Sequence, residues 1–116
     1  MEVHMKTLSL KMGKKVFTSG KITAWHSREA FAINKDLIDF ANRGKELKSK
    51  EEKTTQELAD YLDGLAEINT RKANLICEVY GNKFTLDELE KSLSTDEITE
   101  QLTMIVQGIT GIVQKN

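Results

Sequence analysis

The chain has no proline among its 116 residues, and this absence constrains its fold more than any other feature. Proline removes an amide donor and clashes with the preceding helical turn, so a chain without it can form long, uninterrupted helices. From about residue 23 the apolar residues follow a helical period, and those on the first face are Ala30, Ile33, Leu37, Phe40 and Ala41. This pattern predicts a helix near 24–43 that ends at Gly44, since glycine is common just after a helix.

A second helix is predicted near 55–80, after a polar stretch at 45–55 that we interpret as a linker or a frayed helix end. Its stripe is formed by Leu58, Tyr61, Leu62, Leu65, Ile68, Leu75, Ile76 and Val79. Asn69 and Lys72 interrupt this stripe. Either the helix leaves the core there, with the lysine stem on apolar surface and its charge in water, or this side faces a partner chain.

Two capping boxes mark the remaining helices. In each box a hydroxyl residue precedes a glutamate by three positions, Thr85 before Glu88 and Ser94 before Glu97. The first box predicts a short helix near 86–92. The second box predicts a last helix near 96–114.

The last helix has the clearest periodicity in the chain. Its stripe consists of Ile98, Leu102, Ile105, Val106, Ile109, Ile112 and Val113. Gly108 and Gly111 interrupt the helix, each at a cost of about 1 kcal/mol relative to alanine. One interpretation is that both glycines are simply tolerated inside the helix. The other is that they allow another backbone to approach closely, or that they make the C-terminal end of the helix less stable.

A β-hairpin is predicted near 6–18, where two short β-prone runs flank Gly13. An isolated hairpin is only marginally stable in water, so it must pack on the helices or pair with another chain. The sequence therefore predicts a single, mainly α domain over residues 1–116. In this domain the N-terminal hairpin precedes three to four amphipathic helices between residues 24 and 114.

The composition argues against several functional classes. The net charge is −1, which gives the whole chain no basis for strong electrostatic binding to nucleic acid. No run approaches the about 18 apolar residues that a membrane span needs, and the N-terminus lacks the features of a secretory signal. The single cysteine, Cys77, excludes an intramolecular disulfide and fits a reducing cytosol.

Residues that could carry catalysis or hold a metal are scarce. His4, His26 and Cys77 show no ligand spacing, no serine lies in a nucleophile elbow, and no glycine-rich loop could cradle a phosphate. We interpret His26 as a structural or half-exposed histidine and Cys77 as an ordinary packed cysteine. The sequence therefore predicts a protein that is not an enzyme and that binds no cofactor or metal.

A cluster of lysines surrounds the predicted hairpin. Its members are Lys11, Lys14, Lys15 and Lys21. Aromatic residues among them are limited to Phe17 and Trp25, which is a weak basis for nucleic-acid recognition. Positive charge on a hairpin also limits edge-to-edge pairing, so we interpret the cluster as a solvated surface.

The segment from Val79 to Leu89 resembles a family motif. Tyr80 is followed by a Gly–Asn turn, one further residue, and then Phe84, Thr85 and a capped helix. This order is similar to that in tail assembly chaperones of long-tailed bacteriophages, especially phages of Gram-positive hosts. The specific residues of the resemblance lie within 76–106, and the chain has Lys91–Ser92 where many members have a glycine.

The resemblance implies a role in virion assembly. Members of this family coat the tape measure protein, the long helical polypeptide that sets tail length, and keep it soluble until the tail tube polymerises around it. The resemblance thus implies that this chain binds the tape measure protein in the host cytoplasm and is absent from the mature virion. We also expect self-association, open-ended in preference to a closed dimer. The reason is that the marginal hairpin and the long apolar last helix suggest apolar surface that remains uncovered after one domain has folded.

We place partner binding on the helical surface that includes the last helix, at Leu102, Ile105, Ile109, Ile112 and Val113. Leu102, Ile105 and Ile109 lie centrally on the stripe, and Ile112 and Val113 are the better candidates if its end lines a groove. Two alternatives remain open at this point: a structural tail completion or connector protein, and a small DNA-binding regulator with a helix-turn-helix.

Overall fold

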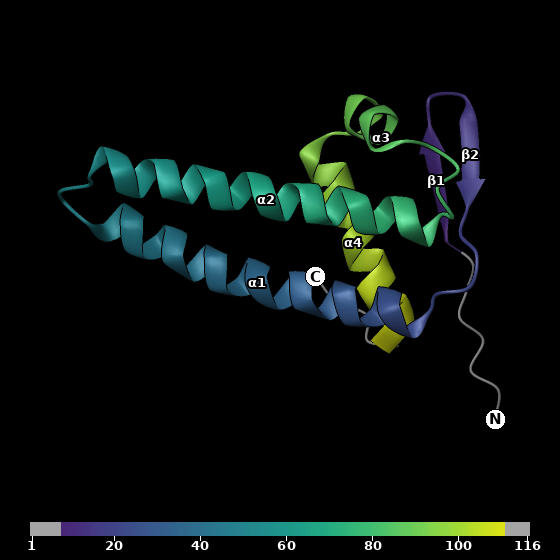
Figure 1. The fold of residues 1–116 in the computed structure, drawn as a ribbon, viewed down its shortest axis with the longest axis horizontal. Coiled ribbons are helices and arrows are strands. Elements are labelled where there is room, and N and C mark those ends of the chain that lie inside the picture. Colours follow the sequence, from purple (N-terminus) through teal and green to yellow (C-terminus); the bar gives the residue numbers. More distant parts are fainter. Residues whose placement is uncertain (1–7, 111–116) are drawn as a thin grey trace.

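A computed structural model describes residues 8–110 of the chain. Two strands, β1 (Ser9–Met12) and β2 (Lys15–Thr18), precede four helices (Figure 1). The helices are α1 (Ala24–Ser49), α2 (Thr55–Val79), α3 (Leu86–Ser92) and α4 (Thr95–Thr110). The prediction of a mainly α fold that begins with a β-hairpin is therefore confirmed.

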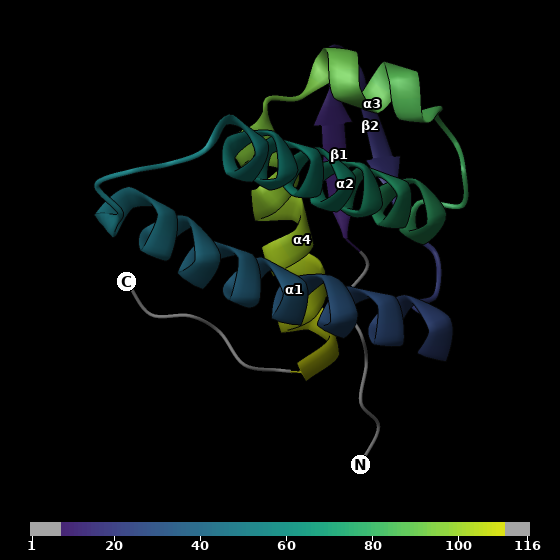
Figure 2. The same ribbon diagram turned by 60° about the vertical axis from the view of Figure 1, so that its left-hand side comes forward.

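The helices form a long arm attached to a smaller body. α1 and α2 run antiparallel side by side, and their linked ends project away from the rest of the molecule (Figure 1). α4 lies across one side of this pair near its other end, while α3 and the hairpin gather around the C-terminal half of α2 (Figure 2). We call the part of α1 and α2 that projects beyond α4 the distal arm.

The hairpin packs on the helices through one face. Met12 pairs with Lys15 across a two-residue turn, and Gly13, with a φ of 64°, supplies the positive φ that a tight hairpin turn requires. Leu8, Leu10 and Met12 are buried. From β2, Phe17 meets the ring of Phe84 edge-on, with centroids 5.0 Å apart. The hairpin thus buries its apolar face against the body, as an otherwise marginal element must.

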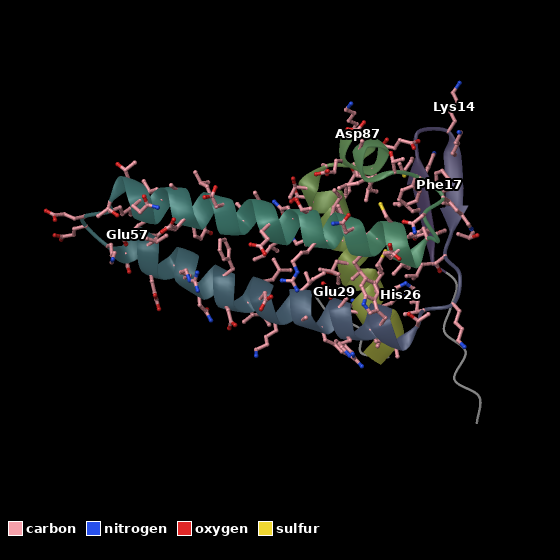
Figure 3. The ribbon with its side chains drawn as sticks, in the orientation of Figure 1. Lys14, Phe17, His26, Glu29, Glu57 and Asp87 are labelled. Carbon is pink, nitrogen blue, oxygen red and sulfur yellow. The ribbon has the colours of Figure 1, made fainter. Side chains whose placement is uncertain are left out.

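Every helix begins at a capping box. The two boxes predicted from the sequence form at Thr85 and Ser94. A third begins α2 at Thr54. A fourth begins α1, where Thr23 Oγ1 accepts from the amide of His26 and His26 Nδ1 accepts from the amide of Thr23. His26 is 8% exposed, so it is a structural histidine at the start of α1 (Figure 3).

The predicted end of the first helix is wrong. α1 continues through Gly44 to Ser49, and the loop before α2 spans only residues 50–54. Gly44 lies inside the helix, where its missing side chain makes room for α2: a Cβ there would lie 2.6 Å from Tyr61 Oη. The following residues are mostly good helix formers, and Leu47 is half-buried. For the last helix, residues 111–114 of the predicted range lie outside the described residues.

Candidate partner-binding surface

Three of the five predicted partner-binding residues lie in the described part of α4. Leu102 and Ile105 are 2% and 0% exposed, in the core that joins α4 to α1 and α2. Ile109 is half-buried and packs against this core. Ile112 and Val113 lie outside the described residues. The central part of the stripe therefore attaches α4 to its own chain, and a role of the stripe in partner binding stays a prediction.

The interface between α2 and α4 contains a buried ammonium group. Lys72 is 4% exposed, and its Nζ donates to Thr99 Oγ1 at 3.1 Å. No carboxylate within residues 8–110 pairs with it, and burial lowers the pKa of Lys72. The interpretation that α2 leaves the core at Lys72 is therefore wrong, since this side chain faces α4 of the same chain.

A polar network joins α2, α4 and β1. Tyr80 is fully buried, its hydroxyl donates to Gln101 Oε1 at 3.1 Å, and burial raises the pKa of Tyr80 to about 12. Gln101 Nε2 donates in turn to the carbonyl oxygen of Ser9 at 3.4 Å. Buried polar groups are tolerated when they are paired in this way, so the network fixes α4 against the body.

The distal arm is held together by two rings and two glycines. The Phe40 ring of α1 stacks on the Tyr61 ring of α2, with centroids 4.5 Å apart and planes at 15°. Each ring lies over a glycine of the opposite helix, Phe40 over Gly64 and Tyr61 over Gly44, where a Cβ would lie 2.6 Å from the nearest ring or hydroxyl atom. The close approach of α1 and α2 therefore depends on small residues at both positions.

One side of the α1–α2 pair carries charged side chains. Arg71 of α2 donates to Asp36 at 2.6 Å, and its other nitrogen lies 3.5 Å from Glu29, which points toward α2 in Figure 3. The hydrogen bond to Asp36 raises the pKa of Arg71. A shallow depression on the same side is lined by charged residues together with Phe40, Gly64 and Ile68; the charged ones are Asp36, Asp39, Arg43, Glu67 and Arg71. This side is polar and holds no large exposed apolar residue.

The distal arm also exposes large apolar residues. Leu58 and Leu62 of α2 are 44% and 61% exposed, and Ile38 of α1 is 59% exposed. Sequence reasoning assigned both leucines to the buried stripe of the second helix and did not single them out as a surface. The sequence offered one signal of their exposure, which is that both leucines lie far along the chain from the dense apolar run at residues 75–79.

Between residues 8 and 110, groups with catalytic potential are not assembled into a site. Cys77 is buried, and burial raises the pKa of its thiol, which keeps the thiol protonated and unreactive. No cluster of potential metal ligands occurs within residues 8–110. None of the helices described is long and apolar enough to cross a bilayer. The lysines around the hairpin are exposed, and Lys14 points away from the body (Figure 3).

The chain was compared with family models, curated proteins and solved structures. The model of a family described as phage tail chaperone protein matches residues 1–116. No curated protein and no solved structure matches the chain.

Proposed function

The chain belongs to the phage tail chaperone protein family, and we propose that it binds the tape measure protein during tail assembly and keeps it soluble. This membership confirms the resemblance seen between Val79 and Leu89. We also propose that its role in tail assembly is non-enzymatic. The proposal goes further than the family description, because it names the tail protein that is bound.

The observation that carries the proposal is the exposed apolar surface of the distal arm. A long helical polypeptide with an apolar stripe aggregates in water unless the stripe is covered. Amphipathic helices bind in grooves and faces formed by other amphipathic helices, with apolar anchors at positions i, i+3, i+4 and i+7. The exposed Leu58 and Leu62 of α2, with Ile38 of α1, are residues of the type such binding uses.

Co-expression tests the proposal. A fragment of the tape measure protein of the same phage is produced alone and together with the chain, and its soluble fraction is measured. We expect the fragment to precipitate alone, and to stay soluble and co-purify with the chain when both are present. A fragment that stays insoluble in the presence of the folded chain would contradict the proposal.

The predicted role of the last helix is tested in the same assay. Replacing both Ile112 and Val113 by Asp is expected to leave the melting temperature nearly unchanged while abolishing solubilisation. If the double variant unfolds first, these residues belong to the core. If it folds and still keeps the fragment soluble, they do not bind the partner.

We further propose that the chain self-associates, acts in the host cytoplasm and is absent from the mature virion. Light scattering over a range of protein concentrations tests self-association, and a mass that stays monomeric at high concentration would contradict it. Proteomics of purified particles tests the last point. Detection of the chain at a fixed copy number would favour the alternative of a structural tail completion or connector protein.

A further inference from the structure

The exposed apolar residues of the distal arm share one side of the helix pair. Phe40 and Gly44 mark where α1 meets α2, and Tyr61 and Gly64 mark the same line on α2. On a helical wheel of about 100° per residue, rotation about each helix axis can be measured from this line. The rotation is about 50–90° for Leu58, Leu65, Lys72 and Ala41. It is about 130–140° for Leu62 and Ile38, and it has the same sense for all six. In antiparallel neighbours, equal senses of rotation fall on the same side of the pair. We call the side formed by Ile38, Ala41, Leu58, Leu62 and Leu65 the distal apolar face.

α4 already occupies the neighbouring part of this side. The hydrogen bond from Lys72 to Thr99 shows that α4 packs on the side of α2 to which Lys72 points. α4 is itself an amphipathic helix that buries Leu102 and Ile105 against the pair. The distal apolar face is thus the continuation, beyond α4, of a surface that already binds one amphipathic helix.

The area of the face matches a helix and not a second folded chain. Its three most exposed residues are 44% to 61% exposed, which gives an apolar area on the order of 300 Å². A stable complex of two folded proteins buries about 800 Å² on each partner, of which roughly 450 Å² is apolar. An apolar contact of this smaller size suits one amphipathic segment that binds and is later released.

The charges beside the face indicate the flank of the partner. Lys45 and Lys48 of α1 are exposed, lie on the same side of the pair by helical period, and belong to the outer end of the arm. Neither forms an ion pair with a carboxylate within residues 8–110. Acidic residues on the partner, next to its apolar stripe, would form ion pairs with these two lysines.

We infer that the distal apolar face binds an amphipathic helix of the partner, parallel or antiparallel to α4 and beside it, with acidic residues next to its apolar stripe. This inference rests on the proposed function, because it takes the partner to be the tape measure protein. It adds the surface, the secondary structure of the bound segment and the sign of its flanking charge.

The first test compares Leu62→Asp with Val16→Asp. Val16 is 64% exposed on β2, so the two substitutions place the same charge at apolar residues of similar exposure, one on the face and one away from it. Both variants should fold, as measured by circular dichroism and melting temperature. Leu62→Asp should weaken binding of the tape measure fragment by at least about tenfold, whereas Val16→Asp should bind as wild type does. Equal binding by the two variants would overturn the inference.

The second test addresses the charge. Replacing Lys45 and Lys48 together by Glu should slow association with the fragment and reduce its salt dependence, while the same change at Lys14 and Lys15 should not. Equal effects of the two pairs would overturn the acidic-flank part of the inference.

Two further outcomes separate the inference from the proposed function. If Leu62→Asp dissociates an oligomer of the chain but still binds the fragment, the face binds a second copy and the inference is overturned while the function stands. If the wild type itself does not bind the fragment, the proposed function is overturned and the inference with it.

Discussion

Replacing Gly64 by alanine should destabilise the protein, although alanine is the better helix former. Gly64 lies inside α2, and an alanine Cβ there would be 2.6 Å from Cε2 and 3.1 Å from Cζ of Phe40. Carbon atoms do not pack this closely, so the ring has to move. Phe40 is 8% exposed and stacks on Tyr61, and its displacement therefore disturbs the contact that joins the two helices of the arm.

Two opposing terms set the magnitude. The helical propensity of alanine contributes about 1 kcal/mol in favour of the variant, and forced overpacking costs about 1–3 kcal/mol. The expected net loss is up to about 2 kcal/mol. Gly44→Ala should lose less, because the nearest atom is the hydroxyl at the far end of the half-buried Tyr61. Gly108→Ala is the matched control: its Cβ would meet nothing within 4 Å, so it should gain about 0.5–1 kcal/mol.

Urea unfolding monitored by circular dichroism measures the free energy of unfolding of all three variants. In thermal melting, 1 kcal/mol should correspond to roughly 3–6 °C for a chain of this length. Adding Phe40→Leu to Gly64→Ala should restore part of the lost stability, whereas Phe40→Leu alone should destabilise the protein. If Gly64→Ala stabilises the protein as much as Gly108→Ala does, close packing of the ring on the glycine is refuted.

Three further predictions concern the α4 interface. Leu102→Ala should cost about 2–5 kcal/mol in urea unfolding, whereas Leu62→Ala, at an exposed site, should stay within about 0.5 kcal/mol of wild type. Lys72→Met should stabilise the protein by about 1 kcal/mol at neutral pH. Because the pKa of Lys72 is lowered in the folded state, this advantage should narrow as the pH rises toward its ordinary value of 10.5. The raised pKa of Tyr80 has the opposite sign: the folded state retains a proton that the unfolded state loses, so wild-type stability should fall from pH 10 to about 12. Tyr80→Phe should abolish this fall and cost about 1–3 kcal/mol at neutral pH, since Gln101 loses its hydrogen bond.

The features that could be predicted from the sequence are local ones. A capping box satisfies the amides of a single turn with side chains three residues apart, so the starts of α3 and α4 followed from Thr85 and Ser94. The hairpin turn followed from Gly13, because a tight turn needs a residue that adopts a positive φ. The period of the apolar residues gave the apolar sides of the helices for the same reason, since it depends only on helical geometry.

The end of α1 was decided by a contact distant in the sequence. Gly44 has the properties of a helix stop when its neighbours alone are considered. The Tyr61 ring packs over it, and this contact makes glycine useful inside the helix. Lys72 was misjudged for a similar reason: its burial depends on α4, whose first residue is Thr95.

The candidate binding surface depended on tertiary structure most of all. Leu62 and Leu102 both belong to apolar stripes predicted from the sequence, yet the first is 61% exposed and the second 2%. The period states which side of a helix is apolar, but not how much of that side another element covers. α4 has 16 residues and crosses α2, which has 25, near one end. The crossing therefore leaves the distal apolar face uncovered, because a helix laid across another can bury only the few turns that it contacts.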